Sequence, residues 1–110
     1  MAEVAIIVPT LRRPDSLARA LGSLFAQARV GDRVSEIVVV DNDPSGSAEA
    51  GVEALRAFAP WPLVYVHAPR PGVATARNAG LAATRAPLIA FLDDDEAASP
   101  GWLAALLEAR

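Results

Sequence analysis

The 110-residue sequence contains no cysteine and no lysine, and it has no long hydrophobic run. Without cysteine, disulfides, thiolate catalysis and cysteine-ligated zinc are excluded. No apolar run approaches the roughly 20 residues that span a bilayer, and the brief run Val4 to Pro9, with Glu3 before it, argues against a signal peptide. A net charge of −3 supplies no basic surface for nucleic acid. We therefore expect a cytoplasmic chain with no membrane segment and no nucleic-acid partner.

The length supports one domain, residues 1–110, with an ordinary soluble composition of 53% hydrophobic residues. Strand-like runs cover Val4–Val8, Glu36–Val40, Leu63–His67 and Leu88–Leu92. The first, second and fourth are near-continuous apolar runs, as expected for parallel strands that are covered on both faces. Helical spacing follows each run, over Pro14–Ala28, Ala48–Phe58, Val73–Ala86 and Trp102–Leu107, the last with Ser99 as N-cap and Pro100 at its first position. This alternation predicts an α/β fold with three α/β/α layers and a parallel sheet in the order 3-2-1-4.

Polar side chains follow three of the four predicted strands. Pro9-Thr10 comes after the first, Asp41-Asn42-Asp43 after the second, and Asp93 to Glu96 after the fourth. Ligands of open parallel sheets bind outside the carboxyl ends of the strands. We therefore expect these three segments to converge on one binding edge.

The run Asp93 to Glu96 places four carboxylates side by side, and their mutual repulsion calls for a partner. On an extended backbone Asp93 and Asp95 would point the same way and could share one cation. Hard oxygen ligands suit Mg²⁺ or Mn²⁺, above all when the cation also holds substrate phosphates. The alternative is a solvated loop that caps the last helix.

Four segments together resemble the N-terminal half of a family 2 inverting glycosyltransferase with the GT-A fold. They are "VAIIVPTLRRPDSLARALGSLFAQ", "EIVVVDNDPSG", "RPGVATARNAGLAAT" and "PLIAFLDDDEAASPGWL", and they cover nearly the whole chain in the family's order. The resemblance implies a domain that binds a nucleotide-sugar donor through a divalent metal, Mn²⁺ or Mg²⁺, for sugar transfer to an acceptor hydroxyl.

The same resemblance assigns candidate site residues. The family's Asp-x-Asp element falls on Asp93 and Asp95 as metal ligands, with Asp95 preferred, and Asp94 lies beside the sugar or ribose. Substrate-binding positions fall on Thr10 for the nucleotide, on Asp41 and Asn42 for the base, and on Arg77 and Asn78 for the donor pocket. The resemblance implies a UDP-, GDP- or dTDP-sugar as the donor.

The chain departs from the family pattern in three respects. Leu11 stands where an aromatic residue often stacks on the base, and Asn42 replaces the second Asp of the usual pair. The family's catalytic base lies well beyond the Asp-x-Asp element, and Asp94 and Glu96 are too close to that element to serve. We therefore assign no catalytic base and expect a catalytic domain cut in two.

Other interpretations stay open at this point. The chain could bind a nucleotide-sugar without transferring it, or be an inert fragment. A haloacid-dehalogenase-like phosphohydrolase is disfavoured, because Pro44-Ser45 follows "VVVDND" and no lysine is present. The segment Asp41 to Asp43 is equally consistent with an Asx-turn that closes its strand. The unpaired edge of the fourth strand predicts self-association into a homo-oligomer.

Overall fold

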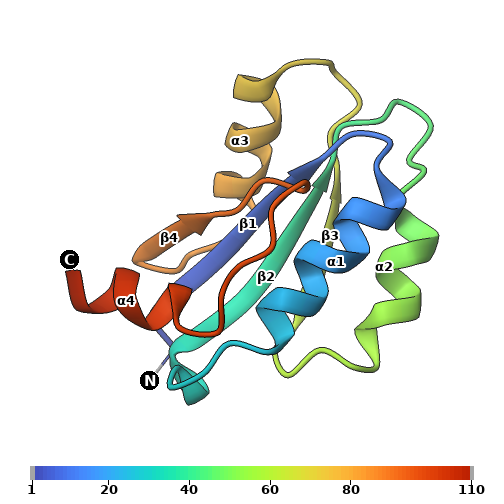
Figure 1. Ribbon diagram of the computed structural model, residues 1–110. Coiled ribbons are helices and arrows are strands. Elements are labelled where there is room, and N and C mark those ends of the chain that lie inside the picture. Colours follow the sequence, from blue (N-terminus) through green and yellow to red (C-terminus); the bar gives the residue numbers. More distant parts are fainter. Residues whose placement is uncertain (1, 110) are drawn as a thin grey trace.

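The computed structural model describes residues 2–109, in which strands and helices alternate along the chain (Figure 1). The elements are β1 (Val4–Thr10), α1 (Pro14–Phe25), the short 3-10 helix η1 (Gly31–Arg33), β2 (Val34–Asp41), α2 (Glu49–Arg56), β3 (Leu63–His67), α3 (Val73–Ala82), β4 (Leu88–Phe91) and α4 (Trp102–Ala109). The four strands form one parallel sheet in the order β3-β2-β1-β4. The predicted fold class and strand order are confirmed.

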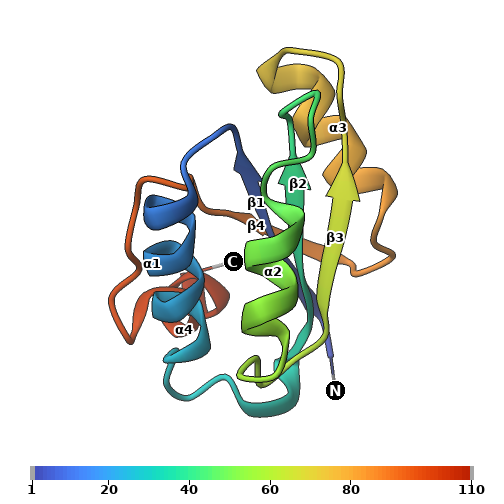
Figure 2. The ribbon, with the colours of Figure 1, turned by 90° about the vertical axis from the view of Figure 1, so that its right-hand side faces the viewer.

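Helices cover both faces of the sheet, which gives the three predicted layers (Figure 2). Side chains alternate along β2, so that Ile37 and Val39 face one way and Val38 and Val40 the other. The first face packs against α1, α2 and α4 and forms the larger core. The second face packs against α3. The continuous apolar runs of β1 and β2 follow from this double cover.

Helix α3 packs directly against the sheet at Gly80. A Cβ added there would lie 2.6 Å from Ile7 Cγ2 and 3.1 Å from Val40 Cγ2, so no side chain fits. The other small residues of the helix serve the same approach; Ala76 is buried against the sheet. The alanine-rich sequence therefore holds the first turns of α3 beside the carboxyl ends of the strands.

The start of α4 differs from the sequence prediction. The helix begins at Trp102, so Pro100 precedes it rather than occupying its first position. The Ser99 carbonyl accepts the Trp102 N–H at 3.0 Å, and the side chain of Gln27, just after α1, accepts the Leu103 N–H at 2.9 Å. Gln27 thus supplies the cap predicted for Ser99, because the chain brings the end of α1 against this turn.

Strand β4 is an edge strand, paired with β1 alone. Its residues are only partly buried apart from Ala90, in contrast to the fully buried run that the sequence suggested. A groove of about 200 Å³ lies between β4 and α4 and is lined mainly by aliphatic side chains. Self-association through this edge stays a prediction. Within residues 2–109 no helix has the length and apolar character needed to cross a membrane.

Candidate functional site

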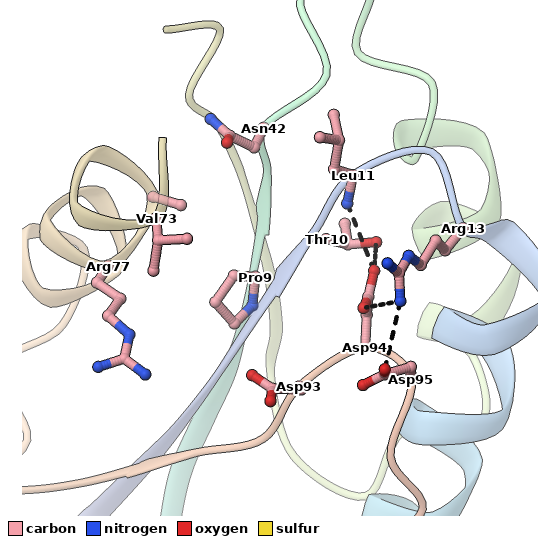
Figure 3. Close-up of a pocket in the computed structure, with 11 residues that line it drawn as sticks. Pro9, Thr10, Leu11, Arg13, Asn42, Val73, Arg77, Asp93, Asp94 and Asp95 are labelled. Carbon is pink, nitrogen blue, oxygen red and sulfur yellow. Dashed lines mark hydrogen bonds and ion pairs between the residues drawn. The ribbon is translucent and has the colours of Figure 1, made fainter. Parts of the chain in front are cut away.

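A cavity of about 320 Å³ opens at the carboxyl edge of the sheet, between the ends of β1 and β4 and the first turns of α3 (Figure 3). Its lining comes from four segments that are far apart in the sequence. The lining residues are Pro9, Thr10, Leu11, Arg13, Asn42, Val73, Ala76, Arg77, Asp93, Asp94 and Asp95. Six of the eight predicted site residues fall in this set, and Asp41 and Asn78 do not.

The acidic run, Asp93 to Glu96, forms a turn rather than the extended segment assumed from the sequence. The Glu96 N–H donates to the Asp93 carbonyl at 3.1 Å, and the Glu96 carboxylate accepts the Asp93 N–H at 3.3 Å. Asp93 and Asp95 are exposed, whereas Asp94 is buried. The turn thus leaves Asp93 and Asp95 open to solvent and directs Asp94 toward the end of β1, and all three residues line the cavity.

Thr10, at the end of β1, holds Asp94 in place. The Thr10 hydroxyl donates to Asp94 Oδ2 at 2.8 Å, and the Leu11 N–H approaches the same oxygen at 3.4 Å. The hydrogen bond joins the carboxyl ends of β1 and β4, which are adjacent in the sheet. Leu11 itself is 48% exposed, so an aliphatic side chain stands at the cavity's rim where an aromatic one was expected from the family.

Arg13 is a site residue that the sequence analysis missed. Its Nη1 lies 3.3 Å from Asp95 Oδ2 and 3.8 Å from Asp94 Oδ1. Figure 3 shows the acidic run between Arg13, just before α1, and Arg77 on α3. The signal was available, since four adjacent carboxylates need a counter-charge and the only basic pair in the chain directly follows Leu11.

Arg77 lines the cavity on the α3 side and is held by an aromatic ring. Its guanidinium carbon lies 4.8 Å from the centre of the Phe91 ring, a cation–π contact with the last residue of β4. The side chain is exposed, so its charge stays available to an anion in the cavity. Asn78, next along the helix, is exposed and lies outside the cavity lining.

Asp41 is fully buried and its carboxylate is used inside the fold. Oδ1 accepts the Asp43 N–H at 3.1 Å, the Asx-turn that the sequence left open. Oδ2 accepts the Ala48 N–H at 2.8 Å and the Tyr65 hydroxyl at 2.7 Å. Burial raises the pKa of the Tyr65 phenol, and the bond to Asp41 raises it further. Asp41 thus fixes the segment that leads into α2 and links β2 to the neighbouring strand β3.

Asn42 lines the cavity, yet its side-chain amide already has partners inside the fold. Nδ2 donates to the carbonyls of Ala68 and Arg70, both at 2.7 Å, and Oδ1 accepts the Gly72 N–H at 3.3 Å. Two donated bonds require an amide, which explains why Asn rather than Asp stands here. Gly72 has φ of 129°, a conformation that favours glycine.

Asp43 links the loop after β2 to the loop before α1. It accepts the Ser45 N–H and hydroxyl, and Arg12 Nε at 3.1 Å. Hydrogen bonds from the Ser47 side chain and the Ser45 backbone hold the pKa of Asp43 well below its usual range, despite the opposing effect of burial. Arg12, at φ of 53°, joins this network to the loop before α1.

The carboxylates of the acidic run suit a hard divalent cation only when a bound ligand supplies further oxygen atoms. Asp93 and Asp95 offer exposed carboxylate oxygens, the ligand type that Mg²⁺ and Mn²⁺ prefer. Residues 2–109 contain no cluster of three or more metal-ligating side chains in place to hold an ion. The residues present fit such a cation when phosphate oxygens complete its coordination.

Comparison with known proteins decides the family. The family model for glycosyl transferase family 2 matches residues 5–109. The chain belongs to glycosyl transferase family 2. The succinoglycan biosynthesis protein ExoM of Rhizobium meliloti is 44% identical over 106 residues, which are 96% of this chain and 34% of that protein. The chain spans about a third or less of the length of the curated relatives that it matches.

Solved structures show the same GT-A fold. Staphylococcus aureus TarS 1-349 in complex with UDP superposes with a TM-score of 0.81 at 22% identity, over 96% of this chain and 31% of that one. A mannosyltransferase from Pyrobaculum calidifontis, in complex with GDP-Man and Mn²⁺, gives 0.75 at 24% identity, over 84% of this chain and 27% of that one. This glycosyltransferase family 2 domain therefore has the GT-A architecture expected from its sequence.

Proposed function

We propose that this domain binds a nucleotide-sugar donor in the cavity at the carboxyl edge, with Mn²⁺ or Mg²⁺ held jointly by Asp93, Asp95 and the donor's diphosphate. The observation that carries the proposal is the convergence of three carboxylates and two guanidinium groups on one cavity. The UDP complex of TarS and the GDP-Man and Mn²⁺ complex of the mannosyltransferase support it by fold.

Each lining residue then has a role that its surroundings fit. Arg77, exposed and steadied by Phe91, binds the diphosphate. Asp94, fixed by Thr10, faces the ribose or sugar. Asp41 and Asn42 were expected to contact the base, but their polar atoms already have internal partners. We propose that Asp41 and Asn42 shape the base end of the cavity by fixing the loops around it.

The reaction is attack of an acceptor hydroxyl on the anomeric carbon of the donor sugar, with the nucleoside diphosphate as leaving group. The cation, when bound, offsets the negative charge on that leaving group. A general base must take the proton of the acceptor hydroxyl. Asp94 is engaged by Thr10 and Arg13, and Glu96 by the Asp93 N–H. We therefore assign no catalytic base within residues 2–109.

Calorimetry tests the donor site. UDP, GDP and dTDP are each titrated with and without Mn²⁺ into the parent, Asp95→Ala and Asp93→Ala. We expect at least one nucleotide to bind about tenfold more tightly with Mn²⁺, a typical coupling between two ligands of one site. Asp95→Ala should abolish that gain and Asp93→Ala should reduce it.

The same experiment separates the alternatives. Absence of binding by all three nucleotides, with or without Mn²⁺, would overturn the donor-site proposal in favour of an inert fragment. Binding without any sugar transfer, when a nucleotide-sugar and candidate acceptors are supplied, would favour a donor-binding module.

A further inference from the structure

Arg13 is the one guanidinium group recorded in ion pairs with the acidic run among residues 2–109. Both contacts come from a single nitrogen, Nη1, which lies 3.3 Å from Asp95 Oδ2 and 3.8 Å from Asp94 Oδ1. They are not the paired parallel bonds of a strong arginine–carboxylate contact. The arrangement therefore neutralises part of the run without fixing it rigidly.

The two contacts differ in how easily they can break. The side chains of Arg13 and Asp95 are 54% and 57% exposed, and exposed ion pairs of this kind are weak. The Asp94 side chain is 12% exposed and is held independently by Thr10. Arg13 can thus leave Asp95 while Asp94 keeps its position.

Asp95 is also the preferred ligand of the proposed cation. A divalent ion on this carboxylate would lie within a few ångströms of the Arg13 guanidinium, and the two positive charges repel. Cation binding to the free protein must therefore displace Arg13 from Asp95. Arg13 borders the cavity in which the diphosphate of the proposed donor lies, so a new anionic partner is within its reach.

Resting on the proposed function, we propose that Arg13 is an exchangeable counter-ion of the acidic run. In the free protein it neutralises Asp95 and competes with the divalent cation. When cation and nucleotide bind together, Arg13 moves from Asp95 to the diphosphate. This exchange makes cation binding depend on the diphosphate, because the diphosphate gives the displaced guanidinium an anionic partner in place of Asp95.

Four proteins test the exchange: the parent, Arg13→Gln, Arg13→Lys and the neighbouring control Arg12→Gln, which removes the same charge but pairs with Asp43 instead. The loss of the electron paramagnetic resonance signal of free Mn²⁺ measures binding, with Mn²⁺ alone and with UDP or GDP, after the loss caused by the same nucleotide without protein is subtracted. We expect Arg13→Gln to bind Mn²⁺ alone about fivefold more tightly, and the gain from nucleotide to fall by about the same factor. Arg13→Lys should stay within about twofold of the parent, since it keeps the charge.

The outcomes distinguish the exchange proposal from the donor-site proposal on which it rests. If the parent couples Mn²⁺ to nucleotide but Arg13→Gln shifts Mn²⁺ binding no more than Arg12→Gln does, the exchange is wrong and the donor site stands. Tighter Mn²⁺ binding by Arg13→Gln with no effect of UDP or GDP in any protein would overturn both. No Mn²⁺ uptake by any of the proteins would also overturn both. Circular dichroism checks that each variant is folded, and Arg19→Gln replaces Arg12→Gln if that control is not.

Discussion

Two triplets of nearly the same sequence, Asp41-Asn42-Asp43 after β2 and Asp93-Asp94-Asp95 after β4, occupy equivalent places in the sheet and have opposite character. The β2 triplet is buried throughout, and each of its side chains accepts or donates hydrogen bonds inside the fold. In the β4 triplet only Asp94 is buried, and the outer two carboxylates are exposed.

The difference lies in what surrounds each strand end. β2 is a central strand, and the loops that lead to α2 and α3 fold over its end and present N–H groups, hydroxyls and carbonyls to it. β4 is an edge strand whose following segment turns toward the cavity, with Thr10 and Arg13 as its neighbours. Acidic residues at a strand end are thus used inside the fold where loops enclose them, and their carboxylates stay exposed where a cavity adjoins them.

The largest expected effect is on stability at the centre of the β2 triplet. Asp41→Ala removes the oxygen that accepts the Ala48 N–H and the Tyr65 hydroxyl. Both donors are partly buried and would lose this acceptor. We expect a loss of about 3 kcal/mol in the free energy of unfolding, measured by urea denaturation. Asp95→Ala should change it by no more than about 0.5 kcal/mol. Equal losses for the two variants would remove the distinction between the triplets.

Next in size is Asn42→Asp, which replaces two donated bonds by a carboxylate facing the carbonyls of Ala68 and Arg70. We expect a loss of about 2 kcal/mol and faster amide hydrogen exchange around Gly72. The control Asn78→Asp alters an exposed side chain and should stay within about 0.5 kcal/mol. A neutral result for Asn42→Asp would mean that the amide does not hold this loop.

The contribution of Asp43 to stability should depend on pH. Its pKa is lowered in the folded protein, so its charged form contributes stability above the ordinary carboxyl value of about 3.9, and that stability is lost as the pH falls through the lowered folded pKa. The stability difference between the parent and Asp43→Asn should be constant above about pH 5 and shrink below about pH 4. A difference that does not change between pH 2 and pH 7 would contradict the lowered pKa.

The smallest effect belongs to the exposed end of the acidic run. Asp93→Asn removes one of four neighbouring charges and should raise stability by up to about 0.5 kcal/mol at low salt. At about 1 M salt, where the screening length falls to roughly 3 Å, the gain should disappear. Thermal unfolding at two salt concentrations measures it. A clear loss of stability would show that Asp93 has a structural partner.

Much of the fold was predictable because its signals are local. Continuous apolar runs with helical segments between them define parallel strands, and the order of the strands then follows from few remaining topologies. The start of α4 was not predictable, because its cap comes from Gln27, which lies far away in the sequence.

The position of the site in the fold was predictable from the sequence. The directions in which its side chains point were less predictable. Family motifs identified the acidic run and Thr10, and the cavity brings them together. Alternation along β2 puts Asp41 on the face of Ile37 and Val39, toward α2, which the motif alone does not reveal. Arg13 was missed because the acidic run and the Arg12-Arg13 pair are each visible in the sequence, but nothing in either segment shows that the two lie in contact.

The central claim is that a cation with nucleotide binds at the acidic run after β4 and not at the triplet after β2. Paramagnetic broadening of amide signals by Mn²⁺, in the presence of UDP or GDP, tests it most directly. We predict that the signals of residues 93–96 disappear at the lowest Mn²⁺ concentration, before those of residues 43–47, and that Asp95→Ala restores them. Broadening that is strongest at residues 41–47, or that Asp95→Ala leaves unchanged, would contradict the account.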